Sequence, residues 1–412
     1  MRLITIAGLV LAVAAAAAAA PVIDIVSGVP HVRSTSSIEG AQLVELQELW
    51  RAGGADDEEN FFGVPTEAVA GPDGRVYLLD TQLATIHIYE SDGTFAGTVG
   101  RDGDGPGEFR FPTGMVRLPG QRLAVTAGMG GKIVVVNEDG TPSASITPGD
   151  EAAGGFQSFF DVKARGEHLV LCGAQMAFAD GGMKERRYLA SYDAATEGFA
   201  TTYWELSGVR DMSKPKFIEK DEYFAANRYD VDAEGRVYVA DNRDAYSVSV
   251  YGPDGGLERV IERPDYAPHV RTDDEKADVT SGMVIMTGNG RLEIENVVED
   301  AAPAIDSLFL DDDGLLWVMD GHAERHEGVY RRYDVFAADG AWLRTVDIVL
   351  PGNNEEDGLM PLGDGRFLHV IGLSGAAEAM QAGVNARHGG DGAVAGDDLG
   401  EGDPLEVICY RL

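Results

Sequence analysis

Residues 72–113 read PDGRVYLLDTQLATIHIYESDGTFAGTVGRDGDGPGEFRFPT. The stretch holds three short apolar runs, over 75–79, 85–89 and 95–99, and an Asp-Gly turn separates the second from the third. The Val, Ile, Tyr and Thr residues of these runs favour strands, and Asp-Gly supplies the positive φ that a tight hairpin requires. The stretch therefore predicts an antiparallel β-meander that ends in a Gly/Pro-rich corner.

The same pattern recurs along the chain. The glycine that opens each unit lies at 74, 120, 166, 235, 314 and 365, and the first two steps are 46 residues each. A further β-like segment precedes most of these glycines, which gives four strands per unit. Because units of this length and strand number are typical of propeller blades, we predict an all-β fold: a six-bladed β-propeller of four-stranded antiparallel blades.

The sixth unit supplies only three strands before the chain ends. Residues 43–50 (LVELQELW) fit a helix or a strand equally well by their apolar positions. As a strand, this segment would complete the last blade from the N-terminal side, so that the ring has no open edge. This 3+1 closure predicts that removal of the last eight residues would unravel more than one strand.

The N-terminal segment is typical of a secretory signal peptide over residues 1–20. Arg2 provides the positive start, residues 3–13 the apolar run and residues 14–20 an Ala-rich cleavage region. We therefore expect export to the periplasm or the extracellular space, and an uncleaved Ala-rich anchor is the alternative. No apolar run after residue 20 is long enough to span a bilayer.

The remaining chain divides into an irregular, polar lead-in over 21–40 and the propeller over 41–412. Insertions at 264–303 and 372–404 interrupt the repeat. The first contains Thr272 followed by Glu275, the spacing of a capping box that opens a short helix. The second is rich in Gly, Ala and Asp, and we expect mostly loop with one short helical turn.

The composition is strongly acidic, with 33 Lys and Arg against 69 Asp and Glu and a formal net charge of −36. Such a charge repels polyanions, so nucleic acid and anionic membrane surfaces are poor partners, and we expect no nucleic acid to bind. Only Cys172 and Cys409 are present, and we expect two buried thiols in place of a disulfide framework. We expect a monomer whose partner is a protein or a small-molecule ligand.

Residues 103–109 (GDGPGEF) and 111–114 (FPTG) resemble the blade-junction signature of NHL-repeat six-bladed β-propellers. The preceding DGRVYLLD and IHIYESDGTFAGTVG fit the same repeat, and the mature chain is similar to exported bacterial six-bladed β-propeller proteins. In this signature we expect Phe109 to be buried between blades and Glu108 to bind nearby backbone amides. The resemblance implies an architecture but no chemistry, because propellers include binding scaffolds, lactonases, lyases and oxidoreductases.

One face of the predicted ring carries the long loops, over 173–186, 321–328 and 373–403. A ligand site is expected on this face. His322 and His326 could share a metal only on a helix, whereas their segment is predicted to be a loop, so solvated side chains are preferred. The candidate binding residues on this face are His322, Arg325, His326, Arg387 and His388.

Five oxygen-bearing residues lie on or just before the predicted inner strands: Glu67, Asp161, Asn227, Asp230 and Asp306. Together they could bind Ca²⁺, which prefers six to eight oxygen ligands, as in gluconolactonase-like propellers. The alternative is that they cap strand ends or face channel water. A shared ion requires all five within about 5 to 6 Å of a common centre.

Two functions follow, and the first is preferred. The protein would be a binding module that uses its long-loop face and central channel; the alternative is a Ca²⁺-dependent lactonase or related hydrolase, and a structural scaffold comes third. No nucleophile elbow, phosphate-binding loop or metalloprotease helix motif is present, and the sequence leaves catalysis open while a non-enzymatic role is preferred.

Overall fold

The computed structural model describes residues 20–412 except 56, 58–59, 129, 149–154, 180–181, 195, 212–215, 281–284, 288–289, 293, 322–327 and 389–403. The predicted signal peptide over 1–20 therefore lies almost entirely outside the described residues. The candidate binding residues His322, Arg325 and His326 lie outside them as well.

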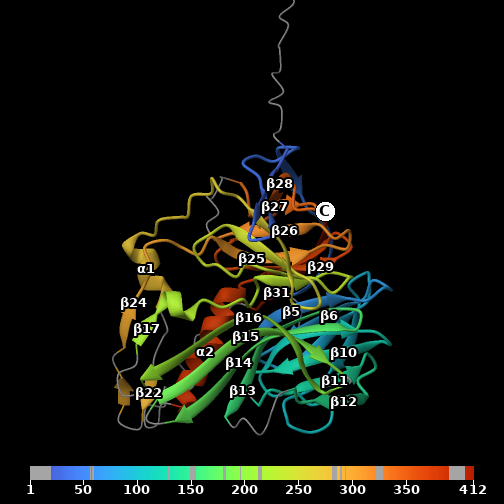
Figure 1. Cartoon of the computed structure of the whole chain (residues 1–412). Helices are drawn as coiled ribbons and strands as arrows, with labels where there is room; N and C mark the ends of the chain where they lie inside the picture. The colour runs from blue at the N-terminus through green and yellow to red at the C-terminus, as the bar shows by residue number, and fades with distance from the viewer. Residues whose placement is uncertain are drawn as a thin grey trace, which may run out of the picture.

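Six sheets follow one another along the chain, and in each of them four strands form an antiparallel blade (Figure 1). The predicted six-bladed β-propeller is therefore confirmed. The inner strands of neighbouring blades contact one another around the ring, for example β5 with β9 and β9 with β13. The strands of the first three blades are β5 (Pro65–Ala70), β6 (Val76–Asp80), β7 (Thr85–Tyr89) and β8 (Phe95–Val99); β9 (Pro112–Leu118), β10 (Arg122–Ala127), β11 (Ile133–Asn137) and β12 (Pro142–Ile146); and β13 (Phe156–Arg165), β14 (His168–Ala179), β15 (Gly182–Asp193) and β16 (Gly198–Asp211).

The second half of the ring contains blades 4 to 6. Their strands are β18 (Tyr229–Val231), β19 (Val237–Val239), β20 (Ser247–Tyr251) and β21 (Leu257–Glu262); β25 (Ile305–Leu310), β26 (Leu316–Asp320), β27 (Arg331–Phe336) and β28 (Trp342–Val349); and β29 (Gly358–Gly363), β30 (Arg366–Ile371), β31 (Glu406–Arg411) and β4 (Gln47–Gly53). Blade 6 thus takes its outermost strand from the N-terminal part of the chain, which confirms the 3+1 closure.

The N-terminal segment is more ordered than the sequence predicts. The structure differs from the irregular lead-in expected over 21–40, because β1 (Val22–Val26) and β2 (Val29–Arg33) form a hairpin around Ser27 and Gly28, both at positive φ. Strand β2 pairs in parallel with β21 and so widens blade 4. The apolar alternation is short and lies outside the repeat, which is why the pattern of the units does not reveal it.

The stretch 43–50 splits between two blades. Its first part belongs to β3 (Ala41–Glu45), which pairs in parallel with β28 of blade 5, and only its second part lies in β4. Leu46, at the break, is 6% exposed and packs into the core between blades 5 and 6. Burial of this one side chain explains why the chain passes from one sheet to the next here.

Both insertions contain helices. The predicted capping box is confirmed: α1 (Asp273–Val279) begins after Thr272, whose Oγ1 accepts from Glu275 N while Glu275 Oε2 accepts from Thr272 N. In the second insertion, α2 (Leu373–His388) replaces the expected short turn, since residues such as Ala, Glu, Met and Gln favour helix. The remaining short elements lie outside the blades. They are β17 (Lys216–Ile218), η2 (Glu219–Glu222), β22 (Ile285–Thr287), β23 (Gly290–Leu292) and β24 (Glu295–Val297).

The blade junction after the first unit has the structure that the sequence predicts. Phe109 is 1% exposed and packs between Val99 of blade 1 and Leu123 of blade 2. A Cβ at Gly100 would lie 2.0 Å from the Phe109 ring, and Gly100 has φ +84°, so only glycine fits there. Glu108 accepts hydrogen bonds from the Gly105 amide and from Arg101. Both residues therefore have the structural roles expected of them.

One buried histidine gives a testable pH dependence. The His87 side chain is 6% exposed, and neither ring nitrogen has a hydrogen-bond partner among the described residues. Asp80, 3.8 Å away, instead accepts from the amides of Gly63, Val64 and Leu83. Burial lowers the pKa of His87 below its usual 6.5, and Asp80 offsets this only in part. The folded state therefore binds fewer protons than the unfolded state between these two pKa values.

We expect the free energy of unfolding to fall as the pH drops below about 6.5, by about 1.4 kcal/mol for each unit by which the folded pKa is lowered. His87→Leu should remove part of this loss in urea titrations at pH 7.5 and 5.5. Exposed His168→Leu is the control and should retain it. Identical pH dependence in the wild type and His87→Leu would contradict the prediction.

Candidate functional site

A lysine crosses the central channel. The Nζ of Lys163, in β13 of blade 3, lies 3.6 Å from Oε1 of Glu67 in β5 of blade 1 and 3.5 Å from Oδ1 of Asp161. Blade 2 stands between these two blades in the ring, so the lysine side chain reaches past it. Because side chains alternate along a strand, Asp161, Lys163 and Arg165 share one side of β13.

Two of the predicted channel carboxylates cap backbone amides. Asp161 accepts from Val162 N at 2.7 Å and from Asn227 N at 3.4 Å. Asp230 accepts from Val231 N at 2.8 Å and from Leu310 N at 2.8 Å. Each carboxylate thus joins the inner strand of its own blade to the next blade. This is the strand-capping role that the sequence allows as the alternative to metal binding.

The other predicted channel residues are engaged separately. Asn227, at φ +62°, contributes its backbone, donating to Asp161 and accepting from Leu308 N. Asp306 lies 4.0 Å from a guanidinium nitrogen of Arg228. The structure therefore brings Glu67 and Asp161 together around Lys163, with Asp230 on the adjoining Arg165 at 3.6 Å, and does not gather all five around one centre.

Lys163 and Arg165 are the channel residues that sequence reasoning missed. Their signal was present, because residues 161–165 (DVKAR) alternate charged and apolar side chains in an inner strand. A search for metal ligands considers only oxygen-bearing residues, and these two cations lie two and four positions after Asp161. The inner surface is consequently an ion-paired network, with Arg165 also donating to Leu310 O of blade 5 at 3.0 Å.

The pKa values of Glu67 and Lys163 are both raised, for different reasons. Burial and the charges of Asp161 and Asp230 raise the pKa of Glu67 to about 7, although Lys163 opposes the rise. Burial alone would lower the pKa of Lys163, but Asp161, Glu67 and Asp230 together raise it above its ordinary value. At neutral pH the lysine is therefore a fixed cation, and its charge is the main influence that opposes the raised pKa of Glu67.

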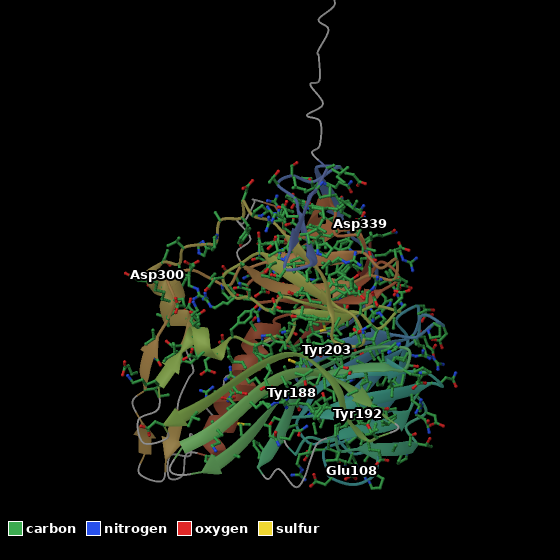
Figure 2. All side chains as sticks on the ribbon, in the orientation of Figure 1. Glu108, Tyr188, Tyr192, Tyr203, Asp300 and Asp339 are labelled. Atoms are coloured by element: carbon green, nitrogen blue, oxygen red, sulfur yellow. The ribbon has the colours of Figure 1, made fainter. Side chains whose placement is uncertain are left out.

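The long-loop face carries a sheet extension in place of the loop predicted over 173–186. Strands β14, β15 and β16 run 12 to 14 residues each and project past the other blades (Figure 1). The sequence 173–186 is rich in Gly and Ala and contains no β-branched residue, so its pattern does not predict this hairpin. Buried Tyr188 and Tyr203 anchor the blade from which the extension projects (Figure 2).

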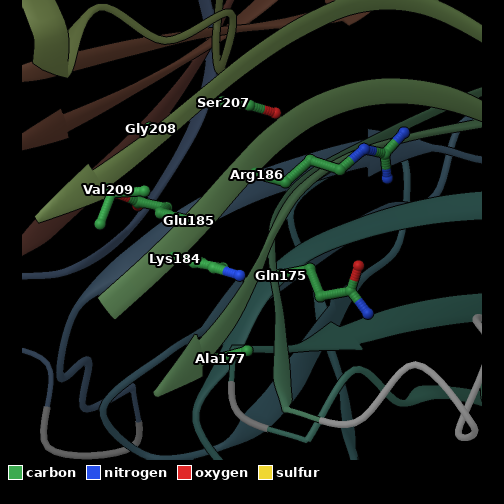
Figure 3. A pocket seen from close by; sticks show the side chains of 8 residues that line it. All are labelled: Gln175, Ala177, Lys184, Glu185, Arg186, Ser207, Gly208 and Val209. Carbon is green, nitrogen blue, oxygen red and sulfur yellow. The ribbon is translucent and has the colours of Figure 1, made fainter. Parts of the chain in front are cut away.

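One side of the extension is covered and the other is open. On the covered side, Arg187 and Arg210 form ion pairs with Glu185 of the extension and with Glu222 of η2. A hollow of about 430 Å³ lies on the extension, and most of the side chains that line it belong to the open side. The residues that line this hollow are Gln175, Ala177, Lys184, Glu185, Arg186, Ser207, Gly208 and Val209 (Figure 3).

The hollow presents several hydrogen-bond donors, of which the Ser207 hydroxyl already donates to Glu205 Oε1 at 3.0 Å. Gln175, Arg186 and Ser207 are cross-strand neighbours, and Figure 3 shows Gln175, Lys184 and Arg186 projecting to the same side. Lys184 forms no ion pair with any residue that the structure describes. Arg186 Nε donates to Glu205 at 2.7 Å, and its guanidinium carbon lies 5.0 Å from the centroid of the Tyr188 ring, which leaves the two outer nitrogens facing outward.

The remaining predicted binding residues are Arg387 and His388, which lie in the last turn of α2. Within the described part of the chain, no three His, Cys, Asp or Glu side chains are placed to share a metal ion. No helix there is both long and apolar enough to cross a membrane.

By sequence, the chain matches no protein-family model and no curated protein. By structure, it is similar to a member of the DUF4221 family from Bacteroides vulgatus, with 12% identity, a TM-score of 0.47 and coverage of 89% of this chain and 97% of that chain. It is also similar to the calcium-binding protein regucalcin from Agrobacterium tumefaciens (13% identity, TM-score 0.41, 90% and 95% covered). A third similar structure is virginiamycin B lyase from Staphylococcus aureus (8% identity, TM-score 0.42, 88% and 98% covered). Similarity this low carries no information on activity. The assignment of the fold rests on the strand order within the blades. The NHL-type repeat stays a prediction from the sequence.

Proposed function

We propose that this propeller is an exported binding module that holds a small organic anion in the hollow of the blade 3 extension. The observation that carries the proposal is the exposed, unpaired Lys184 beside the outer nitrogens of Arg186, on the open side of a sheet in a protein with a net charge of −36. A cationic site of this kind is unexpected on such a surface unless it has a partner of opposite charge.

The two cations have different parts in this proposal. Glu205 and the Tyr188 ring fix the Arg186 guanidinium, so its outer nitrogens can meet a carboxylate in the paired geometry that guanidinium favours. Since Glu205 neutralises part of the Arg186 charge, Lys184 supplies most of the attraction. Ala177 and Val209, which is 72% exposed, offer apolar contact for the body of the ligand.

The direct test compares 3-phenylpropanoate with its uncharged amide by isothermal titration calorimetry. The acid should bind and the amide should bind much more weakly. Lys184→Gln should weaken binding of the acid by roughly ten- to a hundredfold, since a hydrogen bond to a charged group contributes about 1.5 to 3 kcal/mol. Lys132→Gln is the matched control, because Lys132 also forms no ion pair with the described residues. Equal binding of acid and amide, or equal affinities of the two lysine variants, would contradict the proposal.

A channel hydrolase is the second candidate, and Glu67 is the observation that favours it. A carboxyl group with a pKa of about 7 suits general acid–base chemistry near neutral pH. The calcium-dependent form fits the residues poorly, because the Lys163 ammonium lies between two of the carboxylates that would hold the ion. Hydrolysis of δ-gluconolactone that is abolished by Glu67→Gln would support this candidate, and no turnover by the wild type would eliminate it.

A further inference from the structure

The geometry points to Lys163 as a built-in cation of the channel, which occupies the place of a divalent metal between Glu67 and Asp161. The wild-type protein then takes up no divalent cation there, and removal of the amine creates a site for one. This inference concerns the channel and does not depend on the proposed function of the hollow.

The first step is steric and electrostatic. The Lys163 Nζ lies 3.6 Å from Glu67 and 3.5 Å from Asp161, whereas Ca²⁺ requires oxygens at about 2.3 to 2.6 Å. An ion at that distance from both oxygens would lie against the ammonium, because all three groups share the same small space. The positive charges repel each other, so lysine and metal are alternative occupants of one position.

The second step concerns the charge that remains without the amine. Asp161 has only 5% of its side chain exposed, and Glu67 has 25%. Loss of the ammonium leaves these partly desolvated carboxylates without their shared counter-charge, which is costly in a poorly hydrated site. Arg165 is held on Asp230 and Leu310 O and does not replace it. A divalent cation restores the balance and completes its flexible oxygen shell with water.

The third step is mechanical. Glu67 belongs to blade 1 and Lys163 to blade 3, so the lysine ties together two blades that are not neighbours. A cation held by Glu67 and Asp161 would make the same connection. Cation binding in a variant without the amine should therefore stabilise the folded state, which gives a readout independent of any activity.

The experiment measures CaCl₂ binding by isothermal titration calorimetry and thermal unfolding in CaCl₂ against EDTA. The wild type should release no binding heat and keep the same Tm. Lys163→Met should bind Ca²⁺ and raise its Tm by roughly 3 °C at about a hundred times the Kd. The gain should vanish in the double variant with Glu67→Gln. Lys184→Met removes the same charge elsewhere and should gain nothing.

Lys163→Gln is the second variant, because it keeps a hydrogen-bond donor if Lys163→Met folds poorly. A variant that folds in CaCl₂ and fails to fold in EDTA also supports the inference. Two results overturn it: wild-type binding of Ca²⁺ that weakens at least tenfold in Glu67→Gln, or failure of both lysine variants to gain any dependence on Ca²⁺.

Discussion

A chain that ends at Pro404 is expected not to fold. The eight residues removed contain β31, which pairs with β30 on one side and with β4 on the other. Without β31, β4 has no strand to pair with in blade 6. Five of the lost side chains are buried, at 405 and 407–410. At about 1.5 to 3 kcal/mol for a large apolar side chain, their combined loss is on the order of 10 kcal/mol, which approaches the whole stability of a typical protein.

The measurement is cooperative thermal unfolding followed by circular dichroism. A matched control begins at Ser34 and so removes β1 and β2 from the other end of the chain. Because every residue of β1 is exposed, Val32 is the one buried residue of β2, and blade 4 keeps its four strands, this shorter chain should unfold cooperatively with a Tm only slightly below that of the wild type. A C-terminal truncation that keeps the wild-type Tm would show that β31 and β4 do not close the ring.

Glu219→Ala is expected to release the insertion over 264–303 from the propeller. The Glu219 carboxylate accepts from Arg243 at 2.5 Å, from Arg271 at 2.7 Å and from the Glu299 amide at 2.9 Å. Arg243 is only 5% exposed, and its other side-chain partner, Asp244, is half exposed. Loss of the carboxylate therefore leaves a buried guanidinium incompletely paired, at a cost of about 3 to 5 kcal/mol.

Hydrogen–deuterium exchange locates this effect. Amides over 269–279 and 295–301 should exchange faster in Glu219→Ala, while the blades keep their protection. Glu258→Ala removes an exposed acidic residue from the outer strand of blade 4 and is the control. Unchanged exchange over both segments would show that Glu219 does not hold the insertion in place.

The sequence predicts the ring well because blade structure is local. Each turn, strand run and Gly/Pro corner is encoded within one unit, and Phe109 and the Thr272 cap behave as their neighbours in the sequence imply. Pairing between distant segments is not encoded in this way. The division of 43–50 between blades 5 and 6 depends on where Leu46 finds a buried position, which no local pattern reveals.

The candidate site is predicted only in part, for a related reason. The inner-strand position of Glu67, Asp161 and Asp230 follows from the repeat, but their partners do not. Lys163 meets Glu67 from a blade two places away, and the donors of the hollow meet only because 173–186 continues as strand. In both places the candidate site consists of side chains brought together by tertiary structure.

The most direct test of the binding proposal is hydrogen–deuterium exchange with and without saturating 3-phenylpropanoate. Bound ligand should slow exchange over 174–179, 183–187 and 205–210, the strands that form the hollow, and leave exchange unchanged in the inner strands β5, β13 and β18. Protection confined to those inner strands, or no protection anywhere, would contradict the proposal.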